Sequence, residues 1–328
     1  MKHAFSTVTL APALDITLTC RKFPEPGDVI TGFSEIETPG GKGLNAARWL
    51  AMRGHSVVAS GIIGAEGIAP FLALLARYGV ADALCRVPGS NRRNVMVTSP
   101  GGMFKVNRQA FPCLRAEDWS LERILAPCLE ADVCVLAGSL PRAVPPSVYA
   151  AMIEALRRAG VPAVLDAAGA SLALGLEAGP ALIKPNSQEC GELLGSEPRT
   201  PGDFRAACRT LLEKAECVLI SDGPGGCWFA ARGDGGRIFH GSAPDVEVMD
   251  TTAAGDALLA EFCHWHFPTR RLDEDAIRHA CAAGAAATEM PGAASPSLAR
   301  VDALAGEVVV TTYESNPRRG GADHERIR

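Results

Sequence analysis

The 328-residue chain lacks several features that mark whole classes of protein. Its 32 basic and 37 acidic residues are spread out without a basic run, so no broad surface for nucleic acid or an anionic membrane is expected. No apolar run approaches the roughly 20 residues that cross a bilayer, and the first ten residues lack the apolar core of a signal peptide. We therefore expect a cytoplasmic protein that binds neither nucleic acid nor membrane.

The chain also lacks a cysteine pattern typical of disulfides or zinc. Its eleven cysteines are odd in number, scattered, and contain no Cys-x-x-Cys pair. Most lie in apolar segments, as Cys134 and Cys217 do, which predicts reduced and buried thiols. Several Cys and His residues gather between 263 and 281, but no spacing there matches a zinc site, so we expect none.

Over most of its length the chain alternates apolar β-like runs with helical patterns. This alternation is typical of a parallel sheet with helices on both faces, and a hydrophobic content of 47% is enough for a large core. Strands are expected at 4–10, 56–61, 132–137, 162–166, 181–184 and 216–221. Helices are expected near 43–54, 66–78, 117–130, 146–159, 186–195, 202–215, 255–267 and 273–289.

Two kinds of segment depart from this alternation. Residues 16–38 and 84–108 are rich in Thr, Val, Ile and Phe with turn residues, so we expect a small β lid inserted into the main fold. Gly and Pro separate short β runs further along, which predicts an antiparallel edge on the parallel sheet. These runs are 227–231, 237–240 and 246–249.

The chain after about Tyr313 is polar and rich in Arg and Gly. This composition is typical of a disordered tail. We therefore expect one domain over 1–313, with the lid inserted in it, followed by a tail over 314–328 that carries no chemistry.

The segment Asp250-Thr251-Thr252-Ala253-Ala254-Gly255-Asp256 precedes an apolar, helix-forming stretch. Small residues at the start of a helix leave backbone N–H groups that attract anions, helped by the helix dipole. Asp256 lies in the first turn, so a carboxylate that can take a proton lies beside groups that stabilise developing negative charge. The segment indicates phosphoryl transfer to a hydroxyl, and an Asp in an ordinary helix cap is the alternative.

A second glycine-rich segment, Gly40-Gly41-Lys42-Gly43, also precedes a helix. Its glycines allow a ligand to approach the backbone, and Lys42 adds a cation. It is not a Walker A loop, because Gly43 follows the lysine where Ser or Thr would stand. Lysine occurs at only six positions, 2, 22, 42, 105, 184 and 214, and two of these fall in such segments. A flexible turn with a solvated lysine is the alternative.

Three further segments follow expected strands, where ligands bind in open α/β folds. Lys184-Pro185-Asn186 leads into a helix, with Asn186 as N-cap and Glu189 three residues later. A capping box explains both residues; the functional alternative is that they organise water around a phosphate-bound Mg²⁺. The turn from Ser221 to Gly226 could pass under a nucleotide, although hairpin turns look the same. The third segment is Gly138-Ser139-Leu140-Pro141.

In this order, the segments resemble the ribokinase-like (PfkB) carbohydrate kinase family from about Ala4 to Thr312. The branch they resemble contains the 1-phosphofructokinases, tagatose-6-phosphate kinases and minor 6-phosphofructokinases. The resemblance rests on Thr9-Leu10-Ala11-Pro12-Ala13-Leu14-Asp15, Gly40 to Asn45, Arg92-Arg93-Asn94-Val95, Gly138 to Pro141, and Ile183 to Asn186. It implies a three-layer αβα fold with a mostly parallel central sheet.

The resemblance also implies a role for each matching position. Asp256 would take the proton of the acceptor hydroxyl, in an anion hole made of Ala253, Ala254, Gly255 and Asp256. The sugar and its phosphate would be held by Asp15, Gly40, Gly41, Lys42, Asn45, Arg92 and Ser139. ATP would be bordered by Lys184, Asn186, Ser221, Gly223 and Gly226. Glu189 would contact Mg²⁺ through water, and the lid would form a homodimer.

Three departures from the family pattern concern the sugar, the anion hole and the lid. Ala11 stands where the family usually has Asn. Ala253 stands where the anion hole usually begins with Gly, which a methyl group permits if φ is negative there. The lid segment after Phe104 is more basic than usual.

We expect an ATP- and Mg²⁺-dependent kinase of a ketohexose monophosphate, with fructose 1-phosphate as the leading acceptor. A kinase of an unphosphorylated sugar or nucleoside is the first alternative, and a catalytically silent sugar-binding protein is the second.

Overall fold

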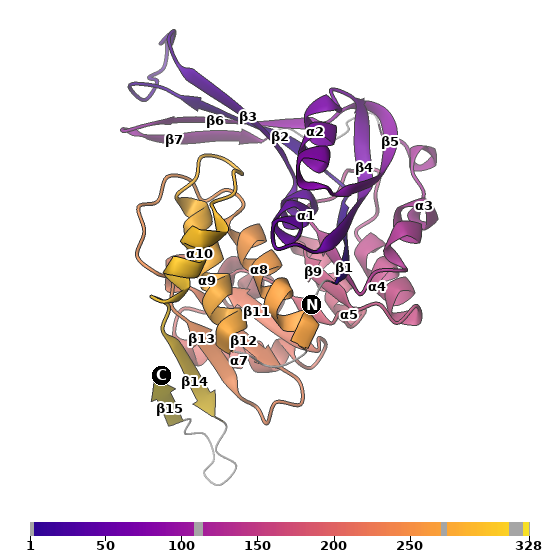
Figure 1. Ribbon diagram of the computed structural model, residues 1–328, viewed down its shortest axis with the longest axis vertical. Coiled ribbons are helices and arrows are strands. Elements are labelled where there is room, and N and C mark those ends of the chain that lie inside the picture. The colour runs from indigo at the N-terminus through magenta and orange to yellow at the C-terminus, as the bar shows by residue number, and fades with distance from the viewer. Residues whose placement is uncertain (1–2, 108–113, 270–273, 315–323, 328) are drawn as a thin grey trace.

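Parallel strands form the centre of the molecule in this computed structural model, which describes residues 3–107, 114–269, 274–314 and 324–327 (Figure 1). The large sheet has 11 strands in the order β15-β14-β13-β12-β11-β10-β9-β8-β1-β4-β5. Pairing is parallel from β11 to β5 and antiparallel from β11 to β15. The strands are β1 (Ala4–Thr9), β4 (Ser56–Glu66), β5 (Ala81–Ser90), β8 (Val133–Ala137), β9 (Ala163–Asp166), β10 (Leu182–Ile183), β11 (Cys217–Ser221), β12 (Cys227–Ala231), β13 (Ile238–Gly241), β14 (Val310–Glu314) and β15 (His324–Ile327).

Helices cover both faces of this sheet, because alternate strand residues enter two separate hydrophobic cores. In β8, Val133 and Val135 belong to one core and Cys134 and Leu136 to the other. The first core includes α1 (Lys42–Met52), α2 (Ala69–Tyr78), α8 (Ala254–Thr269), α9 (Glu274–Thr288) and α10 (Leu298–Ala305). The second includes α3 (Leu121–Leu125), α4 (Val148–Arg158), α5 (Gly169–Glu177), α6 (Ser187–Leu194) and α7 (Pro201–Leu211). The molecule is therefore a three-layer αβα fold, as expected.

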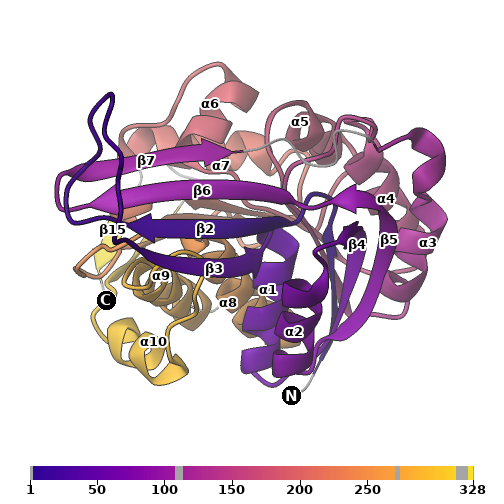
Figure 2. The same ribbon diagram turned by 90° about the horizontal axis from the view of Figure 1, so that it is seen from above.

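The lid is a separate four-stranded sheet with the order β3-β2-β6-β7, and Figure 2 shows its strands side by side. Its strands are β2 (Ala13–Thr19), β3 (Ser34–Gly40), β6 (Arg92–Ser99) and β7 (Gly102–Asn107). One face is turned towards the main fold, because Thr17 and its partner Met96 are buried. The neighbouring pair Leu18 and Val97 lies on the opposite face and is only half-buried. The prediction of a mixed sheet with a small β lid is confirmed.

The lid boundary was wrong at one end. We expected residues 84–108 to be lid, but the stretch up to Ser90 completes β5, which pairs in parallel with β4 of the main sheet. No helix separates β5 from β6, because the chain passes directly from one sheet to the other at Asn91. The stretch 84–108, which we expected to lie wholly in the lid, is therefore divided between the two sheets.

Other predicted elements also need correction. The helix expected over 117–130 is divided into α3 and two 3₁₀ turns, η1 (Ala116–Asp118) and η2 (Ala126–Cys128), and Pro127 in the second turn cannot donate a helical hydrogen bond. The run 246–249 does not form a strand. The pattern missed α5, α10 and β14.

The expected tail differs in part from the structure. Glu314 ends β14, and residues 324–327 form β15 against it, so a disordered tail does not describe them. The rest of that segment, 315–323 and 328, lies outside the described residues. Within the described part of the chain, no helix is both long and apolar enough to cross a membrane.

Candidate active site

The N-termini of α1 and α8 meet above the carboxyl ends of the parallel strands. α1 begins at Lys42 and α8 at Ala254. Asn45 in the first helix donates from Nδ2 to Oδ2 of Asp256 in the second, at 2.8 Å, and both side chains are buried. The N–H groups of Gly255 and Asp256, at the second and third positions of α8, have no acceptor within the helix. A buried carboxylate therefore lies beside backbone donors suited to an anion.

Burial raises the pKa of Asp256 above its ordinary value. Lys42 and the Asn45 hydrogen bond act in the opposite direction, while Asp166 adds to the rise. A carboxylate with a raised pKa is a stronger base than a solvated one, which suits a group that accepts a proton from a hydroxyl.

Two lysines converge on one buried aspartate next to this centre. Lys42 Nζ lies 2.7 Å from Asp166 Oδ1, and Lys184 Nζ lies 3.4 Å from the same oxygen. Burial alone would raise the pKa of Asp166, but the two lysines hold it below its usual range. Burial alone would lower the pKa of Lys42, but Asp166, Asp256 and Glu189 raise it. The Lys42 ammonium group therefore stays charged beside Asp256.

Lys184 also lies close to the N-terminus of α8. It directly follows β10, and a Cβ built on Gly255 would lie 3.5 Å from its Nζ. Lys184 is 3% exposed, which is rare for lysine, and its ammonium group is paired with Asp166.

Ala253 has φ of 63°, the left-handed region, and is alone among the described non-glycine residues in having positive φ. The sequence-based condition of a negative φ at this position is therefore wrong. An L-residue in this conformation costs about 1–2 kcal/mol relative to the right-handed one. The loop is held in place by Asp250, which accepts from Thr252 N at 2.8 Å and from Gly292 N at 2.9 Å. The strained start of α8 is thus imposed by its surroundings.

Asp15 and the end of β3 form a second polar group beside Asn45. Asn94 donates to Asp15 at 2.7 Å, and burial raises the pKa of Asp15. A Cβ on Gly40 would lie 3.1 Å from Asn45 Oδ1 and 3.5 Å from Asp15 Oδ2, so Gly40 keeps the space between them open. Asn45 Oδ1 is buried without a partner. These groups can hold hydroxyls of a polyol.

Arg92 begins β6 and is paired in register with Ala13, two residues before Asp15. Burial lowers the pKa of its guanidinium, although Asp15 acts against this change. Its Nε atom is buried and has no hydrogen-bond partner. Such an unsatisfied cation is suited to an anionic ligand.

Gly41, with φ of 127°, directly precedes α1. A Cβ built on Gly41 would lie 2.9 Å from the Thr9 side chain.

Asn186 and Glu189 form the capping box that explains them structurally. Asn186 Oδ1 accepts from Glu189 N, and Glu189 Oε2 accepts from Asn186 N, both at 2.8 Å. For Mg²⁺, the relevant donors are the remaining Glu189 oxygen and Asp166 Oδ2, which is buried without a partner. Among the described residues no group of three or more His, Cys, Asp or Glu could enclose a metal. The oxygens present fit a Mg²⁺ held mainly by phosphate and water.

The turn between β11 and β12 is a hairpin turn, η3 (Gly223–Gly225), at the same edge of the sheet. A Cβ on Gly226 would lie 2.0 Å from the Gly241 carbonyl oxygen, so strand packing alone requires this glycine. Ser221 forms a β-bridge with Asn186, which connects the turn to the end of β10. The turn therefore lies beside the Asn186 end of the site.

The structure brings most of the predicted residues to one edge of the sheet, but not into one contact network. Lys42, Asn45, Lys184 and Asp256 are joined directly or through Asp166. Ser139 has no side-chain hydrogen bond to this network among the described residues, but its neighbour Gly138 donates from its backbone N to the Asp166 carbonyl oxygen at 2.9 Å. The roles of all these residues stay predictions.

Sequence reasoning missed Asp166, Asn94 and Lys105. Asp166 ends the apolar strand β9, and a charged residue there was a usable signal. Asn94 lies inside a motif from which only Arg92 was selected. Lys105 on β7 donates to Thr252 Oγ1 at 3.2 Å across the gap between the lid and the loop before α8, a contact that no local pattern reveals.

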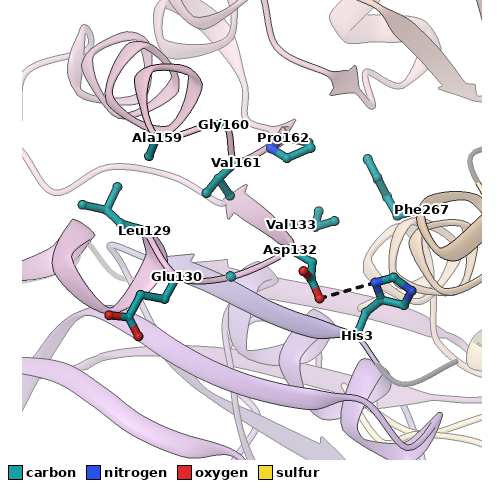
Figure 3. Close-up of a pocket in the computed structure, with 11 residues that line it drawn as sticks. His3, Leu129, Glu130, Asp132, Val133, Ala159, Gly160, Val161, Pro162 and Phe267 are labelled. Carbon is teal, nitrogen blue, oxygen red and sulfur yellow. Dashed lines mark ion pairs between the residues drawn. The ribbon is translucent and has the colours of Figure 1, made fainter.

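The cavities do not by themselves mark this site. A cavity of about 290 Å³ lies at the opposite edge of the sheet, where β8 begins, and is lined by His3, Asp132 and Phe267 (Figure 3). His3 and Asp132 are 3.4 Å apart there. A hollow of about 10 Å³, bordered by Asn45 and Ala253, adjoins the helix N-termini. The chemistry therefore indicates the site more strongly than cavity volume does.

The fold is that of a sugar kinase with ribokinase-like architecture. Residues 8–300 match the pfkB family of carbohydrate kinases, and the chain belongs to this family.

Named relatives agree with this assignment. The chain is 33% identical over 319 residues to a 1-phosphofructokinase of Rhodobacter capsulatus, covering 95% of this chain and 99% of that protein. It is 32% identical over 292 residues to a 1-phosphofructokinase of Vibrio cholerae, covering 87% and 90%. Phosphofructokinase-2 of Escherichia coli, solved in complex with potassium, superposes with a TM-score of 0.83 and 26% identity, covering 93% of this chain and 99% of that chain.

Proposed function

We propose that this protein transfers the γ-phosphoryl group of ATP to a hydroxyl of a ketohexose monophosphate, with fructose 1-phosphate as the first candidate and fructose 1,6-bisphosphate as its product. The observation that carries the proposal is the buried Asp256, hydrogen-bonded to Asn45 and placed in the first turn of α8 near Lys42 and Lys184, which both pair with Asp166. Phosphoryl transfer needs positioning and charge neutralisation more than covalent catalysis, and this set supplies both.

In the proposed reaction, the sugar hydroxyl oxygen forms the new bond to the γ-phosphorus while the bond to the β–γ bridging oxygen breaks. The hydroxyl proton goes to Asp256, and the electron pair of the broken bond stays on ADP. Lys42, Lys184 and the N–H groups of Gly255 and Asp256 would stabilise the transferring group. Mg²⁺, held through water by Glu189, would supply further neutralisation of phosphate charge.

Arg92 favours a phosphorylated acceptor over a neutral sugar, because its Nε atom is buried without a partner. We expect Arg92→Ala to raise KM for the sugar phosphate at least tenfold, with KM for ATP nearly unchanged. Arg93→Ala is the matched control, since Arg93 is exposed and pairs with Glu37 at 3.3 Å. An equal effect of both variants would remove the phosphate-binding role from Arg92.

ADP release measured with several acceptors tests the substrate directly. The acceptors are fructose 1-phosphate, fructose 6-phosphate, tagatose 6-phosphate, ribose and fructose. Highest kcat/KM with fructose 1-phosphate supports the proposal, and preference for ribose or fructose supports the neutral-sugar alternative. No turnover of any acceptor would leave a silent sugar-binding protein, a role against which the assembled Asp256 site argues.

We further propose that two chains pair through the outward face of the lid. This face carries the half-buried Leu18 and Val97 together with Phe104, which is 57% exposed. Exposed apolar side chains on adjacent strands are typical of an interface. Sedimentation of a Leu18→Lys/Val97→Lys variant should show monomers, whereas Val309→Lys, at an exposed apolar position outside the lid, should behave as wild type.

A further inference from the structure

The helices α1 and α8 are joined by side-chain hydrogen bonds at two levels. At the first level, Asn45 donates to Asp256 at 2.8 Å. At the second, Glu261 of α8 accepts from Trp49 Nε1 at 2.7 Å and from Arg53, which caps the C-terminus of α1, at 2.6 and 2.8 Å. Trp49 is four residues beyond Asn45, and Glu261 is five beyond Asp256. At 1.5 Å per residue the two levels are separated by roughly 6–8 Å along the helices.

Glu261 is a fully used acceptor in a fully buried position. Its side chain is 0% exposed, and each of its oxygens accepts two hydrogen bonds, the fourth coming from Trp265 Nε1 at 2.9 Å. Arg53 contacts both oxygens, which fixes the pair in angle as well as distance. Arg53 also reaches Asp302 of α10 at 3.1 Å. A buried ion pair of this kind contributes little net stability, but it specifies one arrangement of the helices that carry it.

Apolar packing between the two levels is less selective. Both helices contribute to one hydrophobic core, with small side chains such as Ala46 and Ala257 and larger ones such as Leu50 and Phe262. Apolar contact is non-directional, so it fixes the register of two helices less sharply than hydrogen bonds do. The relative position of the helices along their axes therefore depends on the directional contacts at the two ends.

The proton acceptor and its hydrogen-bond donor stand on different helices. A shift of one helix along the other would change the distance between Asp256 and Asn45, and misplacements of about 1 Å can cost on the order of a hundredfold in rate. The same shift would break the three hydrogen bonds that Glu261 accepts from Trp49 and Arg53, and would leave its buried charge without a cation. The second level resists that movement.

We propose that Glu261 is a positioning residue for phosphoryl transfer, because its hydrogen bonds to Trp49 and Arg53 hold α8 in register with α1 and so hold Asp256 against Asn45. The catalytic consequence rests on the proposed function, whereas the structural consequence does not.

Two tryptophans provide a matched test, since each donates one hydrogen bond to Glu261. The Trp49 bond joins two helices, whereas the Trp265 bond lies within α8. Trp49→Phe should lower kcat about three- to tenfold with KM for ATP within twofold, and Trp265→Phe should leave kcat within twofold. Equal loss of kcat in both variants, or none in either, would overturn the proposal.

A second variant separates register from stability. Arg53→Met/Glu261→Met replaces the ion pair by apolar groups and leaves no buried charge, but Trp49 Nε1 and Trp265 Nε1 lose their acceptor. We expect a folded protein with a thermal midpoint several degrees below wild type, kcat lowered at least tenfold, and the acidic limb of the kcat–pH profile moved to higher pH. The limb moves because the Asn45 hydrogen bond, which lowers the pKa of Asp256, is weakened. Wild-type kcat and pH profile in this folded variant would contradict the proposal.

A readout without substrate distinguishes this proposal from the proposed function. The side-chain amide signal of Asn45 in a ¹⁵N spectrum, assigned with Asn45→Ala, reports its hydrogen bond to Asp256. It should shift in Trp49→Phe and stay in place in Trp265→Phe. An inactive wild-type enzyme with this pattern would refute the proposed acceptor alone, and an active enzyme without it would refute the positioning role.

Discussion

The two ends of the α1–α8 helix pair satisfy their buried polar groups in opposite ways. At the far end, both oxygens of Glu261 accept two hydrogen bonds each. At the near end, Asn45 Oδ1 and Asp166 Oδ2 are buried without partners, and Ala253 is held in a left-handed conformation. Buried polar atoms are normally paired, so unpaired ones call for an explanation. Under the proposed function, a bound substrate would supply it at the near end, whereas Glu261 at the far end already has its partners.

The largest contrast should come from removing one carboxylate charge at each end. Asp256→Asn removes the proton acceptor while its side-chain oxygen can still accept from Asn45, so kcat should fall about 10²- to 10⁴-fold with ATP affinity nearly unchanged. Asp302→Asn, at the far end, should stay within twofold of wild type. Steady-state kinetics checks both, and near wild-type turnover in Asp256→Asn would exclude it as the base.

Removal of Lys42 should lower both kcat and stability, whereas removal of the exposed Lys214 should lower neither. Lys42→Met leaves the buried Asp166 with Lys184 alone, so we expect kcat to fall about 10²-fold and the free energy of unfolding to fall by about 1–3 kcal/mol. Lys214→Met breaks an exposed pair with Glu177 and should change the free energy of unfolding by about 0.5 kcal/mol or less. Urea denaturation and kinetics on both variants measure the difference. Equal losses of kcat and of stability in the two variants would contradict the distinction between Lys42 and Lys214.

The far end should respond to acid through His55, which contacts His264 of α8 at 2.8 Å between ring nitrogens. Burial, then His264 and His3, lower the pKa of His55 to about 4. The unfolded chain binds a proton near pH 6.5 and the folded chain only near pH 4, so the stability contribution is complete above pH 6.5 and is lost as pH falls between these values. We expect the free energy of unfolding to decrease by about 1–2 kcal/mol over this window.

Denaturation curves at pH 7 and pH 4.5 measure this acid response. His55→Gln should flatten it, whereas His279→Gln, on α9, should keep it. An unchanged pH response in His55→Gln would assign the acid sensitivity to other groups.

The smallest expected effect concerns glycine substitutions near the start of α8 and one turn later. Ala253→Gly relieves a left-handed conformation and should raise the free energy of unfolding by about 0.5–1 kcal/mol. Ala257→Gly, within the regular helix, should lower it by about 1 kcal/mol. Thermal unfolding distinguishes the signs, and a loss of stability in both variants would show that Ala253 carries no strain.

The sequence predicted the layers of the fold and most of the near end, because both depend on local signals. Apolar runs gave the parallel strands, and small residues before an apolar stretch gave the α8 N-terminus with Asp256. Asp166 was missed because its importance comes from two lysines that follow other elements. The φ of Ala253 was misjudged because the surrounding loop, fixed by Asp250, determines it. Glu261 resembles any helical glutamate until its partners on α1 are known.

The connections between the lid and the main fold limit how acceptor preference could be changed in this protein. β2 continues from β1 through residues 10–12, β6 continues from β5 through Asn91, and β3 ends directly at the start of α1. Asn91 is itself tied to Gly64 of β4 by two hydrogen bonds. The lid therefore cannot be exchanged for another lid by joining the chains at exposed loops. To transfer the lid from another kinase, one would also have to transfer the ends of β1 and β5 and the N-terminus of α1. A change of acceptor made in this way would therefore also change the main sheet.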